Sequence, residues 1–88
     1  FGPKRCEKIG MVSGGAGAEL AKAASLGLDT FITGEGPHWT FGLAQELGVN
    51  VIYAGHYATE TFGVRRVAEE VSRKFKITWS FLDIPSEL

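Results

Sequence analysis

Three short apolar runs constrain the fold of this chain most, because each is ended by a glycine-containing corner and followed by a helix-forming segment. The runs are Ile9–Val12, Thr30–Thr33 and Val49–Ala54. Near-continuous apolar runs of this length are typical of strands covered on both faces, and glycine tolerates the tight turns that end them. Strands that alternate with helices form largely parallel sheets through right-handed crossovers. The pattern therefore predicts an α/β fold.

The segments between and after the runs carry helix signals. Ala18–Leu26 is rich in alanine and leucine, and Gly27 is placed to end that helix in the left-handed conformation. Pro37 suits the first turn of a second helix, which Gly48 closes. Thr59 can cap a third helix, whose apolar stripe is Val64, Val67, Ala68, Val71 and Phe75.

Residues 77–82 alternate apolar and polar side chains, as a strand with one covered face does. We therefore predict a fourth strand toward an edge of the sheet. The full prediction is one domain over residues 1–88, with a three-layer α/β fold in the order βαβαβαβ. Its sheet is largely parallel or mixed, with helices on both faces.

A faint internal repeat relates two successive helix–strand units. Leu26–Ile32 matches Leu47–Tyr53 with an offset of 21 residues, and the same offset places Gly34-Glu35 over Gly55-His56. The carboxyl ends of parallel strands share one edge of the sheet, where open α/β sheets bind ligands. We therefore expect the glycine corners to lie together at a ligand-binding edge.

The composition excludes several classes of protein. The chain has 88 residues, of which 44% are hydrophobic and 22% charged, and its net charge is −1. Its basic residues are scattered rather than arranged in a stripe, which argues against nucleic-acid binding. Its apolar runs are too short to span a membrane. The single Cys6, expected to be buried, excludes an internal disulfide and indicates a reducing, cytoplasmic compartment.

The stretch Tyr53–Glu60 concentrates the most chemistry. His56 follows the third run, and Glu60 lies four residues later near the start of the next helix, so both side chains can face one point above the sheet. An imidazole and a carboxylate are good ligands for divalent metals. The alternative is that Glu60 only stabilises the positive end of its helix, while His56 is hydrogen-bonded in a corner. The spacing leaves both interpretations open.

Two further candidates, Glu35 and His38, follow the second run. Glu35 could join a site beside the third corner, or it could accept backbone N–H bonds at a helix start. For His38 a surface imidazole is favoured over a ligand. The turn Ser13–Gly17 resembles a phosphate-cradling turn, but Leu20 stands where a dinucleotide fingerprint has its third glycine, and the Walker lysine is missing. A simple strand-to-helix turn is therefore favoured there.

Aromatic residues are expected mainly in the core. Trp39 and Phe62 lie near the expected rim of the site, where they could stack on a flat ligand or seal a subunit contact. The other members of this group are Phe41, Phe75, Trp79 and Phe81.

Several of these motifs together resemble a known family. They are Phe31-Ile32-Thr33-Gly34-Glu35, Ala54-Gly55-His56-Tyr57-x-Thr59-Glu60, Gly63-Val64 and Phe81-Leu82-Asp83-Ile84-Pro85. They resemble the carboxyl-terminal part of the Ngg1-interacting-factor-three-like proteins, dinuclear-metal proteins also described as GTP cyclohydrolase 1 type 2. The Ser13-Gly14-Gly15 turn is similar to the serine–glycine turn of that family. The resemblance extends from about Ile9 to Pro85.

By that resemblance, His56 and Glu60 match the two carboxyl-terminal ligands of a centre for two divalent ions, such as zinc, iron or manganese. The family's other ligands, an adjacent histidine pair and an aspartate, come from an amino-terminal half without a counterpart here. The chain also starts at Phe1 rather than at a methionine. We therefore expect it to be the carboxyl-terminal part of a longer protein and to be inactive alone. Glu35 matches a motif position near the site and is the candidate catalytic group, either supporting the ligands or transferring a proton.

The resemblance implies a metal-dependent hydrolase that acts on a nucleotide or another phosphorylated small molecule. It also implies a homo-oligomer in the form of a toroidal hexamer, with a small-molecule substrate and neither nucleic acid nor membrane as a partner. The alternative is a non-enzymatic metal-binding or protein-interaction and assembly module, because the family name derives from an interaction with a partner protein.

Overall fold

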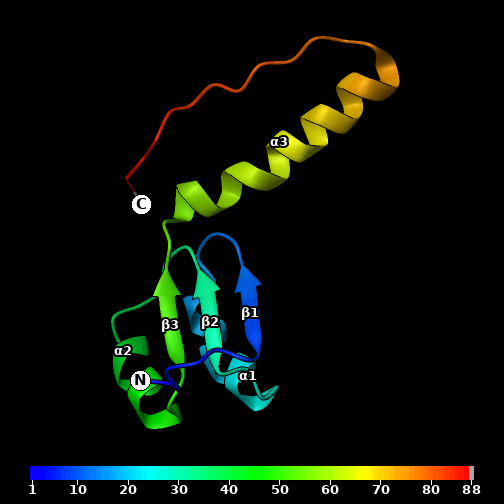
Figure 1. Ribbon diagram of the computed structural model, residues 1–88. Helices are drawn as coiled ribbons and strands as arrows, with labels where there is room; N and C mark the ends of the chain where they lie inside the picture. The colour runs from blue at the N-terminus through cyan, green and yellow to red at the C-terminus, as the bar shows by residue number, and fades with distance from the viewer. Residues whose placement is uncertain (88) are drawn as a thin grey trace.

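A three-stranded parallel sheet forms the body of the molecule (Figure 1). The structure is a computed structural model, and it describes residues 1–87. The strands, in spatial order β1-β2-β3, are Ile9–Val12, Thr30–Thr33 and Asn50–Tyr53. The helices are the 3-10 turn η1 (Gly17–Glu19), α1 (Leu20–Ser25), α2 (Thr40–Leu47) and α3 (His56–Phe75). The predicted α/β class and the first three strands are therefore confirmed.

The register of the sheet brings equivalent ends of the strands together. Ile9 lies opposite Thr30, which lies opposite Asn50, and all three strands run in the same direction. Each strand ends at the upper edge of the sheet in Figure 1. The three glycine corners that follow the strands therefore meet at that edge.

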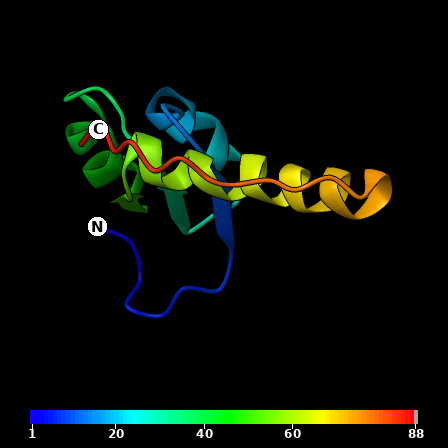
Figure 2. The same cartoon turned by 90° about the horizontal axis from the view of Figure 1, so that it is seen from above.

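The hydrophobic core lies between the sheet and the two short helices α1 and α2, which lie on the same face of the sheet (Figures 1 and 2). Two of the predicted helix stops are seen, because Gly27 and Gly48 adopt φ angles of 79° and 64° just beyond α1 and α2. These left-handed residues turn the chain back toward the next strand. The buried core residues are Leu20, Ala23, Phe31, Ala44 and Val49.

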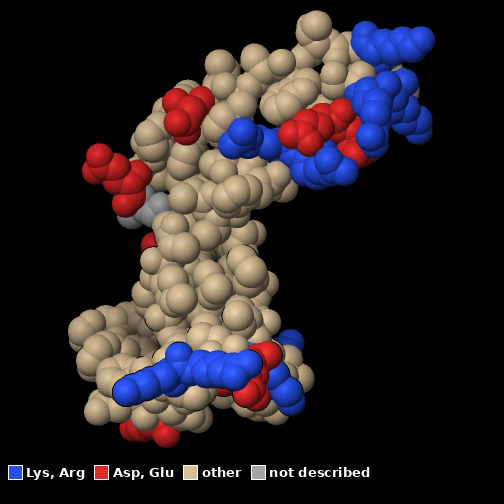
Figure 3. Space-filling model, in the orientation of Figure 1, with Lys and Arg blue, Asp and Glu red and all other residues tan. Residues whose placement is uncertain are grey.

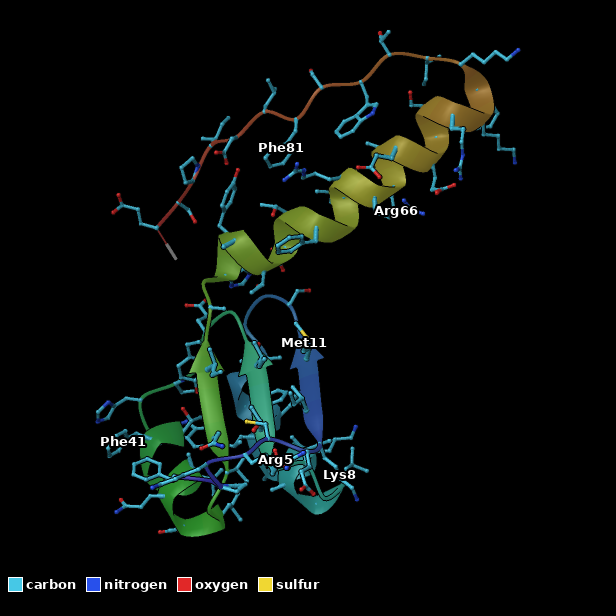
Figure 4. All side chains as sticks on the ribbon, in the orientation of Figure 1. Arg5, Lys8, Met11, Phe41, Arg66 and Phe81 are labelled. Atoms are coloured by element: carbon cyan, nitrogen blue, oxygen red, sulfur yellow. The ribbon has the colours of Figure 1, made fainter. Side chains whose placement is uncertain are left out.

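The opposite face of the sheet carries no helix among residues 1–87, so the predicted helices on both faces are not confirmed. Met11 and Ile52 share that face and are 74% and 49% exposed, and Figure 4 shows Met11 standing out from β1. The amino-terminal segment crosses the lower part of this face. It is held there by Asn50, whose Oδ1 accepts the Gly2 N–H at 2.8 Å and whose Nδ2 donates to the Pro3 carbonyl at 2.9 Å.

The helix α3 projects away from the sheet instead of packing on it (Figures 1 and 2). The radius of gyration is 16.0 Å, compared with about 12 Å for a compact domain of this length. None of the residues of α3 is buried, and the four large side chains of its predicted apolar stripe are exposed. The helix also begins at His56, so the prediction that Thr59 caps it is wrong. Its N-cap is Gly55, whose φ of 96° turns the chain directly from β3 into the helix.

The predicted fourth strand is wrong for the described chain. Residues 77–82 are extended but form no ladder, and they run back along α3 (Figure 1). A strand requires a neighbouring strand to satisfy its backbone groups, and this segment leaves the sheet with α3. The segment and the residue after it are held instead by side chains. Tyr57 Oη donates to Asp83 Oδ1 at 2.9 Å. The Arg65 guanidinium lies 5.1 Å from the ring centre of Phe81, whose place on the segment is labelled in Figure 4.

The surface differs from the expectation in two further respects. Most of the aromatic residues expected in the core lie outside it, because Phe41, Phe75 and Trp79 are exposed. Trp39 and Phe62, which were expected near the rim of the site, are exposed as well. Cys6 is also exposed rather than buried. Charged side chains gather at the far end of α3 and at the base of the sheet, with a largely uncharged surface between them (Figure 3). None of the described helices combines the length and hydropathy needed to cross a membrane.

Candidate functional site

The corners after the three strands are joined to one another by backbone hydrogen bonds. The Gly34 and Glu35 N–H groups both donate to the Gly14 carbonyl, at 2.8 and 3.1 Å. The Gly55 N–H donates to the Gly34 carbonyl at 2.9 Å. Because these bonds continue the order of the sheet beyond its ladder, the side chains that follow each strand are brought to one place.

Glycine is required where these corners approach most closely. A Cβ at Gly34 would lie 2.4 Å from the Gly14 carbonyl oxygen and 2.6 Å from the Cα of His56. A Cβ at Gly14 would lie 2.4 Å from Glu60 Oε1, and the φ of Gly14 is 73°. These two glycines therefore leave the space in which the side chains of the site lie.

The site is formed by Glu35, His56 and Glu60, three of the four candidates from the sequence. His56 lies between the two carboxylates, with Nδ1 2.6 Å from Glu35 Oε1 and Nε2 3.3 Å from Glu60 Oε1. Glu60 lies one helical turn after His56 in α3, so both side chains are on the same side of the helix. The His56 side chain is 36% exposed, and the site is open to solvent.

The two carboxylates stabilise the protonated form of the imidazole. The hydrogen bond to Glu35 is the main reason why the pKa of His56 is raised above its ordinary value. The negative charge of Glu60 acts in the same direction, while partial desolvation opposes it. A cation is therefore favoured at this position, whether it is a proton on the ring or a metal ion beside it.

Thr59 is a residue of the site whose role the sequence did not reveal. Its hydroxyl accepts the Gly14 N–H at 2.9 Å and lies 2.9 Å from the Gly55 carbonyl, to which it donates. Thr59 thereby ties the first turn of α3 to the corner after β1. The sequence does show a polar residue, Thr59, near a helix start and directly before Glu60. It does not show the hydrogen-bond partner of Thr59, because Gly14 lies 45 residues away in the chain.

The turn Ser13–Gly17 uses most of its donors within the protein. The N–H groups of Gly14, Ala16 and Gly17 donate to Thr59 Oγ1, Thr33 Oγ1 and the Glu35 carbonyl. Phosphate cradles need free N–H groups that point at the ligand. This geometry favours the interpretation as a tight turn that supports the site.

His38 lies outside the cluster. It is an exposed residue of the loop before α2 and lines a shallow pocket together with Pro37, Phe41 and Tyr53. Of the two expected rim residues, Phe62 lines a hollow beside the site with Met11, Ile32 and Thr59. Trp39 is exposed at the start of α2.

The donors of His56 and Glu60 fit two positions around one metal ion. Zinc–ligand distances of about 2.0–2.2 Å at a tetrahedral angle bring two donors about 3.3–3.5 Å apart, and Nε2 and Oε1 are 3.3 Å apart. No group of three or more histidine, cysteine or acidic residues among residues 1–87 could by itself hold a metal ion. The described chain therefore offers two donors, and Glu35 contacts the other nitrogen of the ring.

The family model described as Duf34/NIF3 (NGG1p interacting factor 3) matches residues 1–87. A protein from Deinococcus radiodurans named GTP cyclohydrolase 1 type 2 homolog is 46% identical over 87 residues, which are 99% of this chain and 33% of that protein. The protein of the same name from Treponema pallidum is 48% identical over 86 residues, 98% of this chain and 30% of that protein. This chain therefore spans about a third of the length of these curated relatives.

Two solved structures have the same fold over most of this chain. The structural-genomics protein ybgI, of unknown function, is 34% identical and superposes with a TM-score of 0.94, over 99% of this chain and 35% of that chain. The protein TTHA1606 from Thermus thermophilus is 46% identical, with a TM-score of 0.81 over 89% of this chain and 31% of that chain. Since the family model covers all but the last residue, and both sequence and structure agree with it, the chain belongs to the Duf34/NIF3 family.

Proposed function

We propose that this chain is the metal-binding carboxyl-terminal part of a dinuclear-metal hydrolase, of the kind named GTP cyclohydrolase 1 type 2. One observation carries the proposal: His56 Nε2 and Glu60 Oε1 lie 3.3 Å apart, at the edge where α/β sheets bind ligands. The names of the relatives support the choice of enzyme class. The proposed substrate is a nucleotide or a similar phosphorylated small molecule.

Each residue of the site has a defined part in this proposal. His56 and Glu60 would hold one of two divalent cations, such as zinc, iron or manganese. A bound cation would supply an activated water and stabilise negative charge on the substrate. The Gly14–Thr59 bond keeps the first turn of α3, and with it Glu60, in place. The carboxylate of Glu35 contacts His56 Nδ1, as a residue that supports a ligand would. The other role predicted for Glu35, proton transfer, stays a prediction.

Zinc titration of the 88-residue chain, followed by NMR of its two histidines, tests the metal site. We expect weak, saturable binding that shifts the His56 signals, because two donors leave most of the coordination shell to water. His56→Ala should abolish this binding and Glu60→Gln should weaken it, while the matched variant His38→Ala should bind as the wild type does. Equal binding by all variants, or a tight one-to-one complex, would contradict the two-donor site.

The hydrolase part of the proposal needs a longer relative. We expect the 88-residue chain to hydrolyse neither nucleotides nor simple phosphoesters, since residues 1–87 bring two metal donors together. The Deinococcus radiodurans homolog, purified with zinc or manganese, should contain bound metal and hydrolyse at least one compound of such a panel. If that protein contains no metal after loading, the metal-dependent hydrolase is the wrong class.

An assembly module is a second candidate function, and the exposure of α3 favours it. The helix has no buried residue, and the apolar side chains Phe62, Val64 and Val67 are open to solvent on it. We propose that these side chains contact a second copy in a homo-oligomer, for which the predicted form is a toroidal hexamer. Light scattering should give a mass above 9.5 kDa that Val67→Glu returns to the monomer. A monomer at every concentration would exclude self-assembly of this chain.

The cytoplasmic location stays a prediction.

A further inference from the structure

The two ring nitrogens of His56 have unequal partners. Nδ1 lies 2.6 Å from Glu35 Oε1, a distance typical of a strong hydrogen bond to a charged acceptor. Nε2 lies 3.3 Å from Glu60 Oε1, just beyond the usual range for N–H···O bonds. A neutral imidazole carries its proton on only one nitrogen. The shorter contact therefore assigns that proton to Nδ1.

The backbone of Glu35 is held on both sides by the corner after β1. Its N–H donates to the Gly14 carbonyl at 3.1 Å, and its carbonyl accepts the Gly17 N–H at 3.0 Å. A Cβ at Gly15 would lie 3.5 Å from His56 Nδ1 and 3.7 Å from Glu35 Oε1, so this turn packs closely against the pair. The fold thus fixes the backbone of Glu35 within reach of His56, and the carboxylate contacts Nδ1 from there.

The order of the strands explains why this pair forms. β2 and β3 are neighbours in the sheet and run parallel, with Thr33 opposite Tyr53. Glu35 is the second residue after β2, and His56 is the third residue after β3. The sheet therefore brings a carboxylate of one corner to the imidazole of the next, although their separation of 21 residues is one more than the register of the strands.

We propose that Glu35 is a positioning residue, which holds His56 as the Nδ1–H tautomer and turns the free electron pair of Nε2 toward the cation site beside Glu60. The part of this inference that concerns the cation rests on the proposed metal site. A histidine that ligates through one nitrogen needs its other nitrogen anchored, because the anchor sets the tautomer, stops the ring from turning and makes the ligating nitrogen more basic.

The tautomer can be measured directly on the 88-residue chain without any metal. Long-range ¹H–¹⁵N spectra, recorded well above the pKa of His56, report which nitrogen of each neutral histidine carries the proton. We expect the Nδ1–H form for His56 in the wild type. The exposed His38 serves as the internal reference for an unanchored ring.

Three variants separate anchoring from a general effect on the fold. Glu35→Ala removes the acceptor, and His56 should then show the tautomer mixture of His38. Glu35→Gln keeps an acceptor oxygen of similar reach, and the Nδ1–H form should be largely restored. Glu46→Gln, which alters an exposed carboxylate at the end of α2, should change nothing. Circular dichroism of each variant shows whether it is folded. If Glu35→Ala is not folded, the tautomer of His56 in the wild type decides the matter.

Zinc affinity provides the second measurement. Loss of such an anchoring carboxylate typically costs about 10–100-fold in metal affinity, so Glu35→Ala should bind zinc at least about tenfold more weakly than the wild type, and Glu35→Gln should bind it more nearly as the wild type does.

The outcomes distinguish this inference from the proposed function. An Nε2–H tautomer for His56 in the wild type would overturn the inference, and so would an unchanged tautomer and zinc affinity in folded Glu35→Ala. If His56 shows the Nδ1–H form, loses it in Glu35→Ala and regains it in Glu35→Gln, Glu35 positions the ring. If no version then binds zinc, the proposed metal site fails while the anchoring role stands.

Discussion

The Gly14 amide donates a hydrogen bond of 2.9 Å to the Thr59 hydroxyl, and this bond joins the first strand corner to the first turn of α3. The two residues are 45 positions apart in the chain. The helix has no buried residue of its own. Its orientation against the sheet, and with it the position of Glu60, therefore depends on a few such contacts at its first turn.

Replacing Thr59 with valine should loosen this junction. Thr59→Val keeps the side-chain shape but leaves the Gly14 N–H without its acceptor, which should lower the free energy of unfolding by about 1 kcal/mol or more. Urea denaturation measures the loss, and hydrogen exchange at Gly14 should become faster. The matched variant Thr61→Val removes an exposed hydroxyl of the same helix that donates only to the Ala58 carbonyl. It should change stability by less than about 0.5 kcal/mol, and an equal loss in both variants would contradict the special role of Thr59.

Alanine should have opposite effects at different glycines of this chain. At Gly34 its Cβ would meet the Gly14 carbonyl oxygen at 2.4 Å, and backbone on both sides must shift. Gly34→Ala should therefore destabilise the fold by about 1–3 kcal/mol. Gly42 and Gly63 lie in α2 and α3, where a new Cβ would have no atom within 4 Å other than its chain neighbours and the nearby backbone of its own helix. Alanine there should stabilise each helix by about 0.5–1 kcal/mol. Thermal unfolding of the three variants measures the difference, and a stable Gly34→Ala protein would show that the corners are not closely packed.

The stability of the fold should depend on the ionisation of Asp29. Its Oδ2 accepts the Glu7 and Lys8 N–H groups, both at 2.9 Å. The bonds from Lys8 and Glu7 hold the pKa of Asp29 below its ordinary value. Since the folded chain binds this proton less tightly than the unfolded chain, the stabilisation is complete above the unfolded pKa of about 3.8 and is lost as the pH falls through the lower folded value.

Asp29→Asn tests this dependence. The variant should be less stable than the wild type at neutral pH, and its stability should fall less steeply between about pH 4 and the acid limit. Urea denaturation at a series of pH values provides the comparison, with Glu46→Gln as the control carboxylate. Parallel pH curves for Asp29→Asn and the wild type would be incompatible with the proposed contribution.

The carboxyl-terminal segment should depend on Tyr57 for its position along α3. Tyr57 Oη donates to Asp83 Oδ1 at 2.9 Å and accepts the Ile84 N–H at 2.8 Å. Desolvation and the bond to Asp83 raise the pKa of Tyr57. Tyr57→Phe should therefore make residues 77–87 more susceptible to limited proteolysis, while the sheet keeps its protection. Asp83→Asn, which keeps an acceptor oxygen, should have a smaller effect. Equal cleavage of all three proteins would mean that other contacts hold the segment.

The elements that local patterns predict well are those whose conformation depends on neighbouring residues in the chain. β1 and β2 have the predicted bounds, and β3 spans Asn50–Tyr53 within the predicted 49–54. Gly27 and Gly48 end their helices as expected, because a left-handed φ is a local property that glycine tolerates. The fourth strand failed for the opposite reason, since an alternating segment becomes a strand only when another strand lies beside it.

The candidate site shows the same division. Glu35, His56 and Glu60 are expected at one edge because parallel strands end there, and they lie in contact. Their roles as catalytic group and metal ligands stay predictions. The sequence did not indicate which ring nitrogen faces which carboxylate, nor that Thr59 accepts from Gly14.

The residues alone determine three features of this protein. Periodicity and glycine conformation give the order of the first three strands and their helices. The motifs give the family, and the direction of the strands gives the edge of the sheet at which the polar corners meet. Three features required the folded molecule: α3 projects from the sheet, residues 77–87 form no strand, and His56 is held between two carboxylates. Each of these depends on which distant groups lie within a few ångströms, and residue spacing along a chain does not specify that.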